Sequence, residues 1–317
     1  MAGSAVPSSS SPPTSPLAPG SLTGATLLTS PLARAERFVW LTARVLEQRR
    51  FAYHFLDGGA DPVETALTAY RNEDGGYGHA LEPELRGPVS QPAHAVHALR
   101  VLDEIGRCGG QRAERLCRYL TSASTPDGAL PAACLPPEPT AAPMEPAGDL
   151  LATGPVVGVL HRNGVWHAWL FRATDFCWTA VEALAHPDPR QIQAAVAFLD
   201  GVPDRPRAEA AAERLGRLVR GQRLAVLEPE HAPDEHRYHE HHYHAYDFAR
   251  SPDSLARRWF TSAEMDRALD FLAAAQAPDG GWPARSHSWT PTAHLERRPV
   301  RTIEALLTLR AYGREVA

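Results

Sequence analysis

One short stretch in the first third of the chain concentrates side chains that can carry proton chemistry. Residues 78–86 read Gly-His-Ala-Leu-Glu-Pro-Glu-Leu-Arg and bring one histidine, two carboxylates and one arginine close together. A carboxylic acid in apolar surroundings has a raised pKa and can stay protonated, ready to donate to an alkene or a carbonyl. We therefore predict Glu82 as a catalytic acid that His79 orients or reprotonates, with Arg86 as a substrate ligand. The alternative is a solvated loop whose carboxylates cap a helix that begins near Gln91.

A second such stretch lies near the C-terminus. Trp282 and Trp289 flank a Pro-Ala-Arg-Ser-His-Ser segment, and Glu296, Arg297 and Arg298 follow. The two indole faces could stabilise a developing carbocation by cation–π attraction. Glu296 could be a second catalytic acid or base, and Arg298 or its neighbour Arg297 could bind a substrate phosphate or carboxylate. The alternative is ordinary aromatic packing beside a surface Glu–Arg pair.

The densest polar cluster of the sequence is a histidine tract. Five histidines fall within residues 236–244. Imidazole suits zinc, copper and nickel, but metal sites need ligands at set spacing on a supporting element, and this tract follows an acidic, proline-containing segment. We interpret it as a surface loop and predict no metal site. The sequence also contains no Gly-rich phosphate loop, no Gly-x-Ser-x-Gly and no His-Glu-x-x-His, so we expect no cofactor.

A turn motif that recurs along the chain is informative about the fold. Residues 71–77 read Arg-Asn-Glu-Asp-Gly-Gly-Tyr, residues 276–282 read Gln-Ala-Pro-Asp-Gly-Gly-Trp, and residues 124–129 carry a weaker copy, Ser-Thr-Pro-Asp-Gly-Ala. Aspartate can accept backbone N–H bonds in a tight turn, and glycine supplies positive φ. We therefore interpret Asp74 and Asp279 as structural clamps. Repetition at about 50 residues indicates supersecondary units that bury their faces against one another.

Between these turns the apolar spacing is that of helices. From Ala35 onward apolar residues recur at i, i+3, i+4 and i+7, with Gly and Pro between the segments. Residues 1–32 are almost wholly Ser, Pro, Ala, Gly, Thr and Leu, and cannot bury enough apolar surface to fold. We predict a disordered tail over residues 1–32 and a single all-α domain over residues 33–317. This domain would hold five to six helix pairs, closed into a ring or arranged as a short solenoid.

The overall composition excludes several classes of protein. The chain has 317 residues, 37 acidic and 32 basic side chains and a formal net charge of −5; every basic residue is arginine. The absence of a basic tract argues against a nucleic-acid partner. The absence of a run of about 20 apolar residues argues against an integral membrane segment. Four cysteines without a Cys-x-x-Cys pair favour a reducing compartment, and we expect a cytoplasmic protein.

The repeat resembles that of the terpenoid cyclases and the protein prenyltransferase β-subunits. The phrase over residues 74–84 resembles a small group of bacterial proteins known as prenyltransferase and squalene oxidase repeat proteins. This resemblance implies an α/α toroid, in which inner helices surround a deep apolar cavity. Closure of the ring would then bring residues 78–86 and 286–298 side by side, with Glu82 and Glu296 facing the cavity. Tyr77 is a further substrate-binding candidate.

The chain departs from these families in their catalytic motifs. It contains no Asp-x-Asp-Asp and no Asp-Asp-x-x-Asp. From the resemblance we expect an enzyme of secondary metabolism that carries out acid-initiated cyclisation or rearrangement of a hydrophobic, isoprenoid substrate, compatible with transient membrane association. One alternative is a lyase or hydrolase of a polar substrate that uses Glu82 and Glu296 as an acid/base pair. Another is a non-catalytic toroid that binds an isoprenoid or a partner protein.

Overall fold

The computed structural model describes residue 1 and residues 30–132, 147–228, 243–284 and 291–316, so most of the tail predicted over residues 1–32 lies outside it. These residues form α-helices and one 3-10 helix, with no strand among them. In chain order the elements are α2 (Pro31–Thr42), α3 (Val45–Phe55), α4 (Ala60–Thr68), α5 (Pro92–Glu104), α6 (Gly110–Ala123), α7 (Leu150–Arg162), α8 (Ala168–Ala183), α9 (Pro189–Gly201), α10 (Arg205–Gly221), α11 (Ala245–Phe248), η3 (Leu255–Trp259), α12 (Ser262–Ala274) and α13 (Pro291–Ala311).

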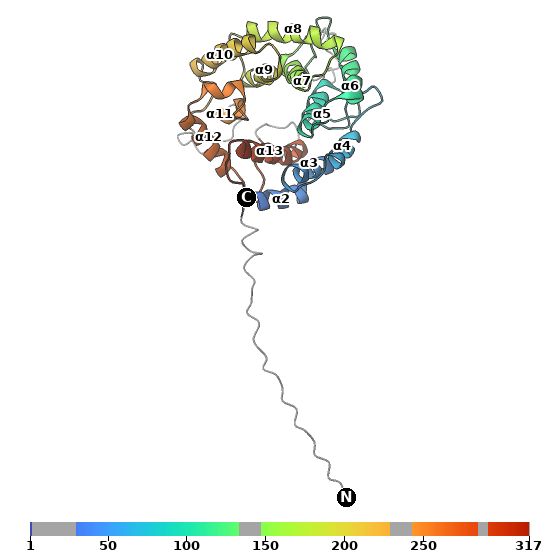
Figure 1. Cartoon of the computed structure of the whole chain (residues 1–317), viewed down its shortest axis with the longest axis vertical. Coiled ribbons are helices and arrows are strands. Elements are labelled where there is room, and N and C mark those ends of the chain that lie inside the picture. The colour runs from blue at the N-terminus through green and yellow to red at the C-terminus, as the bar shows by residue number, and fades with distance from the viewer. Residues whose placement is uncertain (2–29, 133–146, 229–242, 285–290, 317) are drawn as a thin grey trace.

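The helices form a closed ring of two layers (Figure 1). Helices α5, α7, α9 and α13 lie nearest the middle of the ring, and α2, α6, α8, α10 and α12 lie on its outside. The two ends of the described domain join, because the backbone N–H of Leu32 donates to the carbonyl of Val316 at 2.9 Å. Arg34 also donates to the side-chain oxygen of Gln276 at 2.5 Å and 3.2 Å. The described helices follow one another as six pairs, which confirms the predicted α/α toroid and excludes the open solenoid.

The repeated Asp-Gly turns hold the layers together. Asp74 and Asp279 each accept the backbone N–H two residues later, at 2.8 Å and 3.1 Å. Gly75 and Gly280 have φ of 87° and 94°, in the left-handed region that glycine favours. Each turn lies against the next outer helix, since a Cβ on Gly280 would approach the carbonyl oxygen of Arg34 on α2 to 2.2 Å. The interpretation of these aspartates as structural clamps is confirmed.

Local sequence explains where many of the helices begin. Helix α9 starts with a capping box in which Asp188 and Gln191 bond reciprocally, and α12 starts with the same arrangement between Thr261 and Glu264. These side chains satisfy backbone N–H groups that have no partner within the helix. Proline occupies the first turn of α2, α5, α9 and α10, where its fixed φ suits a helix start. The predicted Gly/Pro punctuation therefore sets the helix boundaries.

One side of the inner layer is packed by glycine and alanine. Helices α7 and α9 approach until a Cβ on Gly158 would lie 2.0 Å from the carbonyl oxygen of Ala197. A Cβ on Gly201 would lie equally close to the carbonyl oxygen of Gly158. The described cysteines, Cys108, Cys117 and Cys177, are buried free thiols. No helix in the described part of the chain has the length and apolar character needed to cross a membrane.

Candidate functional site

The two polar stretches singled out from the sequence meet at the inner rim of the ring. Arg86 donates to the Glu296 carboxylate at 2.8 Å, although 210 positions separate them. Arg297, on α13, forms an ion pair and a hydrogen bond with Glu82. The predicted juxtaposition is confirmed for residues 78–86 and the described part of the second stretch. Trp289 falls outside the described residues.

Two histidines of α5 hold Glu82, and neither is His79. The backbone N–H of Glu82 donates to Nδ1 of His94 at 2.9 Å. The Glu82 carboxylate lies 3.5 Å from Nδ1 of His97. His79 instead places its Nε2 2.8 Å from the side-chain oxygen of Asn72. His79 therefore does not contact Glu82, contrary to the expectation, and His97 takes that place. Both His94 and His97 belong to α5 and face the loop that carries Glu82.

The charge state of Glu82 is opposite to the predicted one. Burial alone would raise its pKa, but the hydrogen bond with His97 and the positive charge of Arg297 lower the pKa of Glu82 to about 2. Glu82 is thus ionised at neutral pH, and the expectation of a protonated acid in apolar surroundings is wrong for this structure. Burial lowers the pKa of His94 to about 4. His94 is therefore neutral, and because its Nδ1 accepts a hydrogen bond, its proton resides on Nε2.

Arg44 fixes the loop that carries Glu82. From the residue preceding α3, its guanidinium donates to the carbonyl oxygens of Ala80 and Leu81 at 2.8 Å and 3.2 Å. It also pairs with Glu47 at 2.7 Å and lies 3.7 Å from Glu296. Gln91, which precedes α5, forms no side-chain cap, and the alternative in which the loop carboxylates cap this helix stays a prediction.

A line of charged side chains extends from this site along the helices α3, α5 and α13, and we call it the charged seam. Its members recur at helical spacing, so that each helix turns one polar stripe toward the others. They are Arg44, Glu47, Arg50 and His54 at or on α3, His94, His97, Arg100 and Glu104 on α5, and Arg297, Arg301 and Glu304 on α13. Arg50 bonds the Glu104 carboxylate at 3.0 Å and 2.7 Å. Buried charges are tolerated where they are paired in this way.

Several seam residues were not recognised in the sequence. His94 and His97 were not among the candidate residues that the sequence pattern indicated. Their i, i+3 spacing immediately after the Glu82 loop is the local signal that could have linked them to that loop. The arginine and glutamate stripes of α3 and α13 carry the same kind of signal. Closure of the ring decides which of these charged stripes pack against one another.

The remaining predicted substrate ligands are engaged in bracing the repeat turns. Trp282 is 2% exposed and its indole N–H donates to the carbonyl of Leu272 at 2.7 Å. Arg298 forms two hydrogen bonds of 2.7 Å with Asp279. Tyr77 is buried, and burial raises its pKa. Their part in substrate binding stays a prediction, and their observed contacts are structural.

The described residues contain no cluster of three or more side chains suited to a metal ion. Most of the histidine tract, residues 236–242, lies outside the described residues. Its last member, His244, is buried and precedes α11, where its backbone N–H donates to Asp247 at 2.7 Å.

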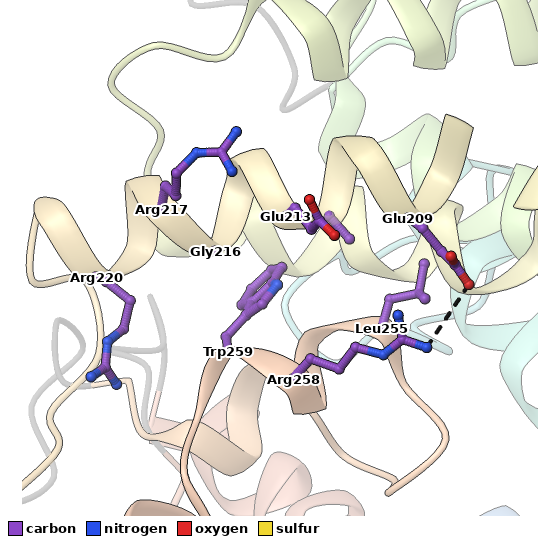
Figure 2. Close-up of a pocket in the computed structure, with 9 residues that line it drawn as sticks. Glu209, Glu213, Gly216, Arg217, Arg220, Leu255, Arg258 and Trp259 are labelled. Carbon is purple, nitrogen blue, oxygen red and sulfur yellow. Dashed lines mark ion pairs between the residues drawn. The ribbon is translucent and has the colours of Figure 1, made fainter. Parts of the chain in front are cut away.

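A groove of about 550 Å³ lies elsewhere, between α10 and η3 (Figure 2). The indole of Trp259 lies against Gly216 on its floor, where a Cβ would approach the ring to 2.6 Å. Other residues that line the groove include Arg217, Arg258 and Glu213. The groove includes none of the residues predicted from the sequence, and α10 lies in the outer layer of the ring.

Comparison with known proteins establishes the fold. No protein-family model matches the chain, and no curated protein matches it. The chain is similar to a crystal structure of a protein from Actinoplanes, with 18% identity, a TM-score of 0.53 and 89% of each chain covered. It also aligns with a variant of the type II terpene cyclase MstE from Scytonema, with 11% identity, a TM-score of 0.48, and 88% of this chain and 86% of that one covered. The all-helical toroid is thus shared with a solved structure, while the chemistry must come from the site.

Proposed function

We propose that the protein is an enzyme that moves a proton on a polar substrate at the inner rim, with His97 as the general base. The observation that carries this proposal is the contact between the Glu82 carboxylate and Nδ1 of His97, 3.5 Å apart. An ionised carboxylate beside one imidazole nitrogen keeps a proton there and leaves the other nitrogen to accept one. The reaction class is hydrolysis or elimination, both of which begin with removal of a proton.

The surroundings of His97 support this role. Its side chain is 5% exposed, so that a bound substrate would meet it largely away from bulk water. Among the described residues Nε2 has no hydrogen-bond partner. The neighbouring Arg297 balances the charge of Glu82, and Arg86, 47% exposed, is available to an approaching substrate. Perturbed ionisable groups gathered at one rim are a general feature of active sites.

The same observations disfavour the isoprenoid cyclisation expected from the resemblance. That chemistry needs a protonated acid in an apolar setting, whereas Glu82 is ionised among arginines and histidines. Trp282 is committed to a buried structural hydrogen bond. A polar substrate fits the charged seam better, because an apolar substrate would desolvate its ion pairs without replacing their hydration.

Two substrate panels test the proposal with the full chain. The polar panel contains carboxylic and phosphate esters, amides and hydroxy acids; the apolar panel contains prenyl diphosphates, squalene and their epoxides. We expect turnover, followed by mass spectrometry and NMR, only with the polar panel. His97→Gln should then lower kcat/KM by about 10²–10⁴, the usual contribution of a general base, and Glu82→Gln should lower it less.

His186→Gln is the matched control, because His186 is exposed and lies outside the rim. It should leave the rate unchanged. Turnover of an isoprenoid that His97→Gln does not slow would overturn the proposal, as would a polar substrate processed equally by the His97 variant.

A further inference from the structure

We propose that His94 is a second catalytic residue, whose Nε2–H donates a hydrogen bond to a carbonyl oxygen of the substrate while His97 removes a proton. This inference rests on the proposed function and deepens it by naming the substrate class. The substrate would be a carbonyl compound, such as a carboxylic ester, an amide or a β-substituted carbonyl compound, and not a phosphate ester. The hydrogen bond from His94 can be observed without turnover.

The proton of His94 lies on the nitrogen that has no contact with the protein. The backbone N–H of Glu82 donates to Nδ1 of His94 at 2.9 Å, so Nδ1 is the unprotonated nitrogen and Nε2 carries the proton. Among the described residues no acceptor meets this Nε2–H. His94 is only 1% exposed, and a donor in such a position is unfavourable when it is unpaired. A ligand oxygen at Nε2 would satisfy it.

The surroundings of His94 keep it neutral. Burial has the largest effect and lowers the pKa of His94, while the negative charge of Glu82 raises it. The neighbouring His97, Arg44 and His79 lower it again, and the resulting pKa is about 4. A neutral imidazole can donate to a developing oxyanion, and it lacks the positive charge that would make a neighbouring histidine less basic.

One residue orients both histidines. His94 and His97 lie three positions apart on α5 and therefore on one helix face. Glu82 contacts Nδ1 of each ring, through its backbone N–H at 2.9 Å and through its carboxylate at 3.5 Å. Because Nδ1 and Nε2 lie on different edges of an imidazole, each Nε2 is directed away from the contact with Glu82. The described residues leave both Nε2 atoms open to water-sized groups, so a carbonyl oxygen is small enough to reach them.

A donor on His94 beside an acceptor on His97 matches the electron flow at a carbonyl group. In elimination, Nε2 of His97 takes a proton from the carbon next to the carbonyl, and the C–H electron pair forms an enolate. The enolate oxygen accepts the hydrogen bond from His94. The electron pair then returns, the bond to the β-substituent breaks, and the leaving group receives the proton from His97.

Hydrolysis would use the same two atoms. His97 takes a proton from water as the water oxygen bonds to the carbonyl carbon, and the C=O electron pair moves to the oxygen that His94 binds. When this intermediate collapses, the C=O bond reforms and the alcohol or amine leaves with the proton from His97. A phosphate ester carries its negative charge from the start and is better bound by a cation than by a neutral imidazole.

NMR of the histidine rings in the full chain, labelled with ¹⁵N, tests the donor directly. The probe is acetohydroxamate, a small planar analogue of an enolate. We expect His94 in the Nε2–H form in the free protein at neutral pH, and a downfield shift of that proton when the probe binds. His94→Asn should remove this signal and weaken binding about tenfold or more, because one donor is lost. His186→Gln, at an exposed position outside the rim, should leave both unchanged.

Two substitutions separate catalysis by His94 from support of the loop. Asparagine places its amide at the level of Nδ1, where it can still accept from the Glu82 N–H, but it lacks a donor at Nε2. Glutamine reaches the level of Nε2 and can donate there. With a carboxylic ester we expect His94→Asn to lower kcat by about 10²–10³, the usual cost of removing one oxyanion donor, with little change in KM. His94→Gln should be the more active variant.

The reverse order of activity would mean that His94 only supports the loop, and would overturn the inference. It would also be overturned if acetohydroxamate left the Nε2 proton unmoved, or if phosphate esters reacted as fast as carboxylic esters. If His94→Asn does not fold, the titration of the unsubstituted protein decides. A shifted His94 proton without turnover of any substrate would reject only the proposed function. Turnover that depends on His97 but not on His94 would reject only this inference.

Discussion

Two sides of the same ring bury their inner helices by opposite means. Helices α7 and α9 lie so close that the glycines between them have no room for a side chain. Helices α3, α5 and α13 instead meet through ion pairs of the charged seam, Arg50 with Glu104 and Arg100 with Glu304. Close backbone packing gains dispersion energy and needs no polar compensation. A seam of paired charges contributes less to stability but supplies groups that can bind and transfer protons. In the function that we propose, one side of the ring contributes stability and the other transfers protons.

The largest expected effect comes from filling the glycine contact. Gly158→Leu would place a side chain where a Cβ already lies 2.0 Å from the carbonyl oxygen of Ala197. Since the obstacle is backbone, we expect the free energy of unfolding to fall by more than about 4 kcal/mol, or folding to fail. Gly221→Leu is the control, because a Cβ there meets nothing within 4 Å. Equal urea midpoints for the two variants would contradict the close packing of α7 and α9.

Removing the shared carboxylate of the seam should have the next largest effect. Glu304→Gln leaves Arg100, Arg250 and Arg301 without their common counter-charge. Breaking a buried ion pair by removing one partner costs about 3–5 kcal/mol, which we expect to see in urea unfolding. Glu182→Gln breaks an exposed pair and should cost less than about 1 kcal/mol. If the two variants were equally stable, the seam would not be buried in solution.

The charged seam should also make the free energy of unfolding depend on pH. Burial raises the pKa of both Glu104 and Glu82, but their neighbours have the larger combined effect. Arg50 helps to lower the pKa of Glu104, and His97 helps to lower that of Glu82, each from an ordinary 4.5 to about 2. A carboxylate with a lowered pKa contributes stability that is complete above 4.5 and is lost as the pH falls toward 2. Each group should contribute about 3 kcal/mol, as an order of magnitude.

Urea unfolding measured between pH 7 and pH 3 follows this loss. Glu104→Gln should be less stable at pH 7 and should show a shallower decline, since one titrating group is gone. An unchanged slope in this variant would mean that Glu104 is not held ionised by Arg50 in the folded protein.

Parts of the site could be predicted from the sequence and parts could not. The repeat turns at both ends of the chain indicated that the first and last units would meet, and the bond between Arg86 and Glu296 confirms it. The protonation state of Glu82 was predicted wrongly, because the loop sequence alone does not reveal that His97 and Arg297 lie beside it. A pKa depends on such neighbours and on burial together.

By itself the sequence determined the helices, their boundaries and the repeated turns. These follow from interactions between residues a few positions apart, such as the capping box of Asp188 with Gln191 and the turn bond of Asp279 to Gly281. Only the tertiary structure decided which charges meet. The partners of Glu82 lie 15 and 215 positions away in His97 and Arg297, and Arg297 reaches it because the ring closes. Local patterns place a charged stripe on each helix, whereas the chemistry of the stripe depends on the helix that it faces.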